Sequence, residues 1–76
     1  MPSPLSEACV GQQVRIAHLR SRPEICLRLR ELGFRENAVI RCINKAAGNV
    51  ICEVCNTRIG LNQLMASSIY VSSDDH

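Results

Sequence analysis

The segment Ser21–Phe34 carries the clearest local signal in the chain and constrains the fold most. It opens with a side chain able to cap a helix, a proline suited to the first turn and an acid that complements the helix dipole: Ser21, Pro23 and Glu24. Apolar residues then recur at the spacing of one helical face: Ile25, Leu29 and Leu32. Gly33 suits the left-handed position that commonly ends a helix. The sequence therefore predicts a helix from about Pro23 to Leu32.

The rest of the chain consists of short segments in which apolar and polar residues alternate, as in half-buried strands. The predicted strands are Gln13–Leu19, Ala38–Ile43, Val50–Cys55, Thr57–Leu61 and Ser68–Val71. A helical turn over residues 63–66, capped by Asn62, precedes the last strand. This is too little sheet for a sandwich. The prediction is a mainly β fold, a small and partly closed β-barrel that hides its edges.

Length and composition fit one folded domain. The chain has 76 residues, of which 46% are apolar and 21% charged, enough for a modest core. We predict a single domain over residues 1–76 with its core at about 5–71. The start around Pro2 and Pro4 is expected to be loose, and the tail Ser72–His76 frayed.

Several function classes are excluded by what the sequence lacks. The net charge of +2 is too small to require a nucleic acid or an anionic membrane. Phe34 and Tyr70 are the only aromatic residues, so there is no platform on which bases could stack. The seven acidic residues are scattered, and no phosphate-binding loop or nucleophile motif is present. We expect no nucleic-acid partner, no catalytic residue and no cofactor.

The chain shows no targeting segment and no apolar run near the roughly 18 residues that a membrane span requires. A soluble, cytoplasmic protein without direct membrane insertion is therefore expected. In that reducing compartment, the odd number of five cysteines argues against a disulfide framework.

Two cysteines form a C-x-x-C pair in the stretch ICEVCN. Residues three apart in a strand point to opposite faces, so Cys52 and Cys55 are not expected to chelate one ion. A redox pair of this type sits at a helix start, whereas this one precedes a strand. We expect Cys52 to lie in the core, where free cysteine behaves as a small hydrophobe, and Cys55 to be the more reactive thiol.

A second cysteine pair depends on the register of the hairpin. If the turn is centred on Ala47, Cys42 and Cys52 are direct cross-strand neighbours; if it is one residue longer, Cys42 faces Glu53 instead. His18 falls on the predicted inward face of the first strand. A metal site formed by Cys42, Cys52 and His18 is the alternative to a structural role, although zinc sites usually require a fourth ligand.

The order of these features resembles a known family. The matching positions are a glycine before the first strand, an Arg-Leu-x-x-Leu-Gly helix end, and a final Ala with an Ile-x-Val strand: Gly11; Arg28, Leu29, Leu32 and Gly33; Ala66, Ile69 and Val71. Where the family has Pro-Gly before the second strand, this chain has Glu36 and Asn37, and asparagine also adopts positive φ. Over about residues 5–71 the chain resembles the FeoA family, the small ferrous iron transport protein A, and the related SH3-like domain that ends some metal-dependent repressors.

The resemblance implies an SH3-like barrel that acts as an accessory protein for FeoB, the membrane ferrous iron transporter with a cytoplasmic GTP-binding domain. It implies no metal or catalytic site of its own. We expect the transporter to contact the helix and its flanks, with these candidates: Arg28, Leu29, Arg30 and Phe34. Leu29 could instead only pack the helix on the barrel. Two other functions stay open, a thiol-based metal or iron sensor and a regulatory SH3-like domain.

Overall fold

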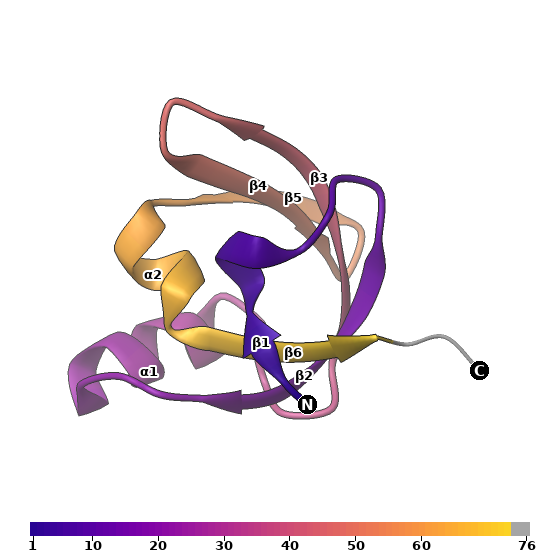
Figure 1. Ribbon diagram of the computed structural model, residues 1–76. Helices are drawn as coiled ribbons and strands as arrows, with labels where there is room; N and C mark the ends of the chain where they lie inside the picture. Colours follow the sequence, from indigo (N-terminus) through magenta and orange to yellow (C-terminus); the bar gives the residue numbers. More distant parts are fainter. Residues whose placement is uncertain (74–76) are drawn as a thin grey trace.

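The computed structural model describes residues 1–73, which form a curled β-sheet with two short α-helices (Figure 1). The strands are β1 (Ser3–Pro4), β2 (Gln13–Leu19), β3 (Val39–Ala46), β4 (Asn49–Val54), β5 (Thr57–Leu61) and β6 (Ile69–Ser73). The helices are the 3₁₀ helix η1 (Leu5–Glu7), α1 (Pro23–Glu31) and α2 (Gln63–Ser67). The predicted fold class is confirmed. Ser72 and Ser73, predicted to be frayed, belong to β6, while the rest of that tail lies outside the described residues.

All strand pairs are antiparallel and follow the order β1-β6-β2-β3-β4-β5. The strand that the sequence did not predict is β1, where Ser3 pairs with Val71 and Pro4 with Tyr70. Two residues give no alternation to detect, and proline is compatible only with an edge strand such as this one. The sheet curls so that α2 lies between its two ends and packs on η1, β4, β5 and β6 (Figure 1).

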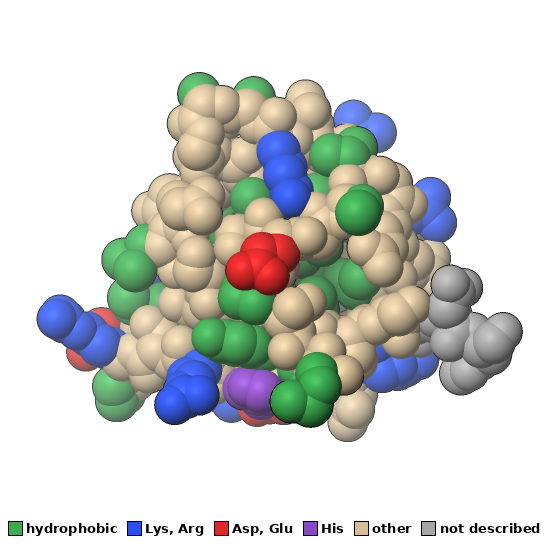
Figure 2. Space-filling view, viewed as in Figure 1, with side chains coloured by type: hydrophobic (Ala, Val, Ile, Leu, Met, Phe, Trp, Pro, Cys, Tyr) green, Lys and Arg blue, Asp and Glu red, His purple; other side chains and the backbone are tan. Residues whose placement is uncertain are grey.

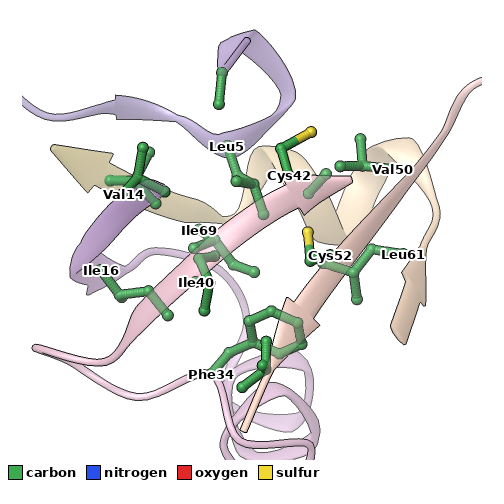
Figure 3. Close-up of a cluster of buried hydrophobic side chains, with 14 of the residues drawn as sticks. Leu5, Val14, Ile16, Phe34, Ile40, Cys42, Val50, Cys52, Leu61 and Ile69 are labelled. Carbon is green, nitrogen blue, oxygen red and sulfur yellow. The ribbon is translucent and has the colours of Figure 1, made fainter. Parts of the chain in front are cut away.

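The curled sheet encloses the core, although some hydrophobic side chains also reach the surface (Figure 2). Side chains with at most 2% of their area exposed meet in the interior (Figure 3). The larger contributors from the strands are Val14, Ile16, Ile40, Cys42, Val50, Cys52, Leu61 and Ile69. Buried residues alternate along β3 and β4, as predicted for half-buried strands, and Cys52 lies in the core as expected.

His18 was predicted to face the interior, and that prediction is wrong. Ile16 pairs with Val71 and His18 with Tyr70, so Ala17 is an extra residue that forms a bulge in β2. The bulge breaks the alternation of the strand. His18 is half-buried, and its ring stacks on Tyr70 with centroids 4.9 Å apart and planes inclined by 8°.

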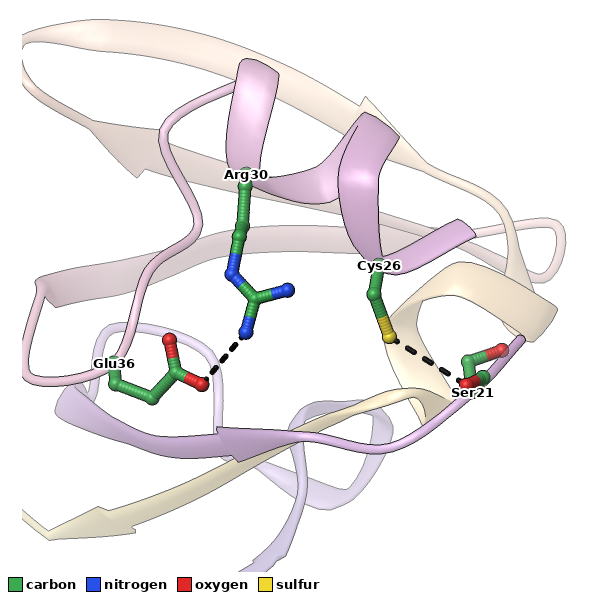
Figure 4. A network of polar contacts seen from close by, with 4 residues as sticks. All are labelled: Ser21, Cys26, Arg30 and Glu36. Carbon is green, nitrogen blue, oxygen red and sulfur yellow. Dashed lines mark hydrogen bonds and ion pairs between the residues drawn. The ribbon is translucent and has the colours of Figure 1, made fainter. Parts of the chain in front are cut away.

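Helix α1 begins without the predicted side-chain cap. Arg22 occupies the N-cap position and makes no capping hydrogen bond, while Pro23 starts the helix as expected. Ser21 lies one residue too early to cap. Its carbonyl oxygen instead accepts a hydrogen bond from the Cys26 Sγ at 3.6 Å (Figure 4).

The other end of α1 is closed by a Schellman motif. The Phe34 amide donates to the Leu29 carbonyl at 2.9 Å, and the Gly33 amide donates to the Arg30 carbonyl at 3.0 Å. Gly33 has the positive φ of 107° that this motif places after the helix. A Cβ atom there would lie 3.1 Å from Val54 Cγ1, so the glycine also permits close packing on β4. The motif turns Phe34 into the core beside Leu29.

The β3–β4 hairpin contains both of the registers left open by the sequence. Its turn residues are Ala47 and Gly48, with Ala46 paired to Asn49, which is the longer register. A bulge between Cys42 and Asn44 then shifts the pairing by one residue. Cys42 therefore lies directly opposite Cys52.

The β4–β5 hairpin changes the expected place of Cys55. Strand β4 ends at Val54, which pairs with Thr57, and Cys55 and Asn56 form the two-residue turn with φ of 52° and 64°. Two positive φ values are typical of a type I′ turn, whose twist suits a hairpin. The prediction that Cys55 belongs to the strand was wrong, while its side chain is exposed as expected.

Candidate functional site

The four residues expected to contact a partner fall into two groups. Arg28 and Arg30 are exposed on α1. Leu29 and Phe34 have no exposed area, because the helix end directs both into the core. A buried side chain cannot form a docking contact, so these two act on the surface only by positioning the helix. Docking through α1 itself stays a prediction.

The structure exposes apolar residues outside this candidate set, and one of them, Leu32, was predicted to lie on the apolar stripe of the helix. Leu27 is 60% exposed on α1, the C-cap residue Leu32 is 37% exposed, and Leu64 is 62% exposed on α2. Figure 2 shows hydrophobic side chains at the surface on the side where these helices lie. Leu27 lies roughly opposite Leu29 around the helix, because two residues advance a helix by a little over half a turn. A leucine off the apolar stripe was the sequence signal for this position.

An ion pair links α1 to the loop that follows it. Arg30 Nη2 lies 2.9 Å from Glu36 Oε2, and both side chains are a little under half exposed (Figure 4). The pKa of Glu36 is lowered, first by a hydrogen bond from its own backbone amide and then by Arg30, with a smaller contribution from His18. The pair holds the guanidinium of Arg30 beside the loop.

The alternative metal site does not assemble. Cys42 and Cys52 are buried cross-strand neighbours, but His18 lies on the far side of the β2 bulge against Tyr70. Within residues 1–73, no group of three His, Cys, Asp or Glu side chains is placed to hold a metal ion. Burial raises the pKa of both thiols, that of Cys52 to about 12, so neither is a ready thiolate ligand.

The outer face of β2, β3 and β4 carries a shallow depression of about 250 Å³. Its lining is mostly polar: Gln13, Val39, Ile40, Arg41, Glu53, Cys55 and Asn56. Arg41 Nη2 donates to Gln13 Oε1 at 3.1 Å across β2 and β3. Glu53 is the direct cross-strand neighbour of Arg41 on β4. The depression thus carries one basic and one acidic side chain on adjacent strands.

The loop before β3 reproduces the turn expected from the family pattern. The Ala38 amide donates to the Arg35 carbonyl at 3.0 Å, and Asn37 has a φ of 73°. Asn37 thus occupies the position that glycine takes in a type II turn. Arg15 Nη1 donates to the Asn37 carbonyl at 2.8 Å and ties the turn to β2. The FeoA domain family model matches residues 3–73.

The chain belongs to the FeoA family.

Solved structures agree with this assignment. A crystal structure of an iron uptake regulatory protein (FeoA) has a TM-score of 0.85 and 22% identity, with 95% of this chain and 96% of that chain covered. Iron(II) transport protein A from Clostridium thermocellum has a TM-score of 0.87 and 26% identity, covering 93% of this chain and 45% of that chain. No curated protein sequence matches the chain significantly.

The same FeoA fold occurs inside a larger regulator. A manganese-dependent transcriptional repressor has a TM-score of 0.87 and 17% identity, and the match covers 95% of this chain but 41% of that one. At this identity the likeness is one of fold alone. In the part of this FeoA domain that the structure describes, no helix is long and apolar enough to cross a membrane.

Proposed function

We propose that this FeoA domain is a small accessory protein for ferrous iron uptake that docks on the cytoplasmic part of an FeoB-type transporter. The observation that carries the proposal is the family match over residues 3–73. It is supported by the solved relatives described as an iron uptake regulatory protein and as iron(II) transport protein A.

The outer face of α1 is the proposed docking surface. Leu29 anchors the helix in the core, so the opposite face is available to a partner. Leu27 provides an exposed apolar side chain there, flanked along the helix by Arg28 and Arg30. An apolar contact with charged neighbours is typical of an interface with a desolvated centre and a polar rim. A single exposed leucine is also common on monomers, so the surface requires a direct test.

Capture of the detergent-solubilised transporter from the same genome by the immobilised FeoA domain tests both parts of the proposal. We expect Leu27→Gln to weaken binding of the transporter about tenfold, which corresponds to a loss of about 1.4 kcal/mol of binding free energy. Val10→Gln is a matched control, because Val10 is 56% exposed and Leu27 60%. Arg28→Glu should weaken binding more than Arg58→Glu, which reverses an exposed charge on β5.

The two ways of failing are distinct. If the wild-type domain does not retain the transporter, the accessory function is wrong. If the wild type and Leu27→Gln retain it equally while both are folded, the function stands and α1 is not the docking surface.

A further inference from the structure

The segment that carries Cys9 is hydrogen-bonded through Gly11 and Gln12 to Cys42, whose cross-strand neighbour is Cys52. Cys9 is exposed, while Cys42 and Cys52 are buried cross-strand partners, and all three are free thiols. We propose that Cys9, Cys42 and Cys52 are a thiol relay through which a low-molecular-weight disulfide, such as glutathione disulfide, oxidises the domain to a Cys42–Cys52 disulfide. This inference is independent of the docking function.

The backbone geometry of the buried pair permits the bond. The Cys42 amide donates to the Gln12 carbonyl at 3.3 Å, and the Cys42 carbonyl accepts from the Gly11 amide at 2.7 Å. Both polar groups of Cys42 therefore point away from β4. Cys42 and Cys52 thus form a non-hydrogen-bonded pair, whose Cα atoms lie about 4.5 Å apart in antiparallel sheets. Disulfides span Cα distances of about 4.4 to 6.8 Å.

The entry thiol lies beside the same residue. The turn from Cys9 to Gln12 is closed by a bond from the Gln12 amide to the Cys9 carbonyl at 3.1 Å. Because Gly11 and Gln12 are the residues bonded to Cys42, this turn brings Cys9 to the same end of β3. The charge of Cys9 also contributes to the raised pKa of Cys42, after burial and in opposition to Lys45, as expected for neighbouring thiols.

The two buried sulfur atoms are not directed toward each other in the reduced protein. Figure 3 shows the Cys52 sulfur directed toward β3 and the Cys42 sulfur directed away from Cys52. Formation of the final bond therefore requires rotation of the Cys42 side chain about χ1. Side chains occupy discrete rotamers, and the relay requires Cys42 to reach Cys9 in one rotamer and Cys52 in another.

Three exchange steps give a balanced reaction. The Cys9 thiolate attacks glutathione disulfide, forming a mixed disulfide and releasing one glutathione. The Cys42 thiolate then attacks the Cys9 sulfur, forming a Cys9–Cys42 bond and releasing the second glutathione. Finally, the Cys52 thiolate attacks the Cys42 sulfur and releases Cys9 as a thiolate. Two protein thiols lose two electrons and two protons, and these reduce one disulfide to two glutathione molecules.

The core favours the disulfide over the other product that two thiols could form. A metal ion held by Cys42 and Cys52 would need both thiolates in an apolar interior, and charge is costly there. A disulfide is neutral. Burial also keeps the fraction of Cys52 thiolate small, so we expect the last step to be slow and to accelerate as the pH rises.

The experiment uses the full chain with Cys26→Ser and Cys55→Ser, which removes the thiols outside the relay. The reduced protein is mixed with glutathione disulfide, alkylated at intervals and digested with trypsin. Cleavage after Arg15, Arg41, Lys45 and Arg58 places Cys9, Cys42 and Cys52 in separate peptides. We expect a transient glutathione adduct on Cys9, followed by a disulfide-linked pair of the Cys42 and Cys52 peptides.

Two variants separate the relay from other routes. Adding Cys9→Ser should slow formation of the Cys42–Cys52 bond at least tenfold, and Cys9 is exposed, so this variant should fold. Adding Cys52→Ala should stop the sequence at a Cys9–Cys42 bond. An unchanged rate in the Cys9→Ser variant overturns the relay. A stable end product other than the Cys42–Cys52 disulfide, or no oxidation of these residues, overturns the whole proposal.

Discussion

Cys42 and Cys52 lie directly opposite each other on β3 and β4, although the turn that joins these strands is set for the other register. Pairing follows the turn as far as Asn44 and Ile51, and the bulge at Ile43 then shifts it by one residue. A slip of one residue moves side chains to the other face of a strand. Without the bulge, the turn register would place Cys42 opposite Glu53. The bulge thus allows a two-residue turn at the end of the hairpin while Cys42 and Cys52 both remain in the apolar core.

The turn itself offers a stabilising substitution. Ala47 has a φ of 52° and Gly48 a φ of 81°, the two positive values of a type I′ turn, in which Asn-Gly is strongly preferred. We expect Ala47→Asn to raise the free energy of unfolding by about 0.5 kcal/mol, measured by urea denaturation. Ala46→Asn changes a strand residue and should give no gain. An equal gain from both would show that the turn conformation is not the cause.

Neighbouring leucines on α1 should differ widely in their contribution to stability. Leu29 is fully buried, so Leu29→Ala should lower the free energy of unfolding by about 2–5 kcal/mol. Leu27 is 60% exposed, and Leu27→Ala should change it by no more than about 0.5 kcal/mol. Thermal unfolding of both variants distinguishes them. Similar values would place Leu29 outside the core and reopen its role as a contact residue.

Side-chain periodicity made most of the fold predictable. The alternation of β3 and β4 and the burial of Leu29 on α1 follow from packing, which depends on residue type, whereas Leu32 of the predicted stripe is 37% exposed. The bulges at Ala17 and Ile43 depend on how one strand pairs with another, and no local pattern records that pairing. His18 was misplaced for this reason, and β1 was missed because it is defined only by its pairing with β6.

The candidate site was predictable in part. Arg28 and Arg30 lie at the surface as expected for late helical cations. Phe34 was named as a contact residue on the helix and its flanks, yet the Schellman motif commonly brings the second residue after the cap onto the last turn. Gly33 was recognised as the helix end, and that motif was the signal that could have placed Phe34 in the core.

The two residues predicted as helix caps should respond differently to alanine. Asn62 Oδ1 accepts a hydrogen bond from the Met65 amide at 2.8 Å at the start of α2. Asn62→Ala should therefore lower the free energy of unfolding by about 1 kcal/mol. The Ser21 side chain caps nothing on α1, so Ser21→Ala should be neutral within about 0.5 kcal/mol. Chemical denaturation measures both, and a neutral Asn62→Ala would refute the cap.

The thiol of Cys52 should make stability depend on alkaline pH. Burial, and then the charge of Cys42, raise its pKa from 9.0 to about 12. Between these values the unfolded chain has lost a proton that the folded chain retains. The unfolded state then binds fewer protons, so the free energy of unfolding falls as the pH rises.

Urea unfolding under reducing conditions should show this contribution intact below about pH 8.5 and reduced by about 1.4 kcal/mol near pH 10. Cys52→Ala provides the control. It should be less stable at neutral pH, because it leaves a small cavity, but its stability should fall less steeply, since only Cys42 remains as a buried thiol. A wild-type curve that stays flat to about pH 10, or a control that falls as steeply, would mean that the Cys52 thiol is not held neutral by the core.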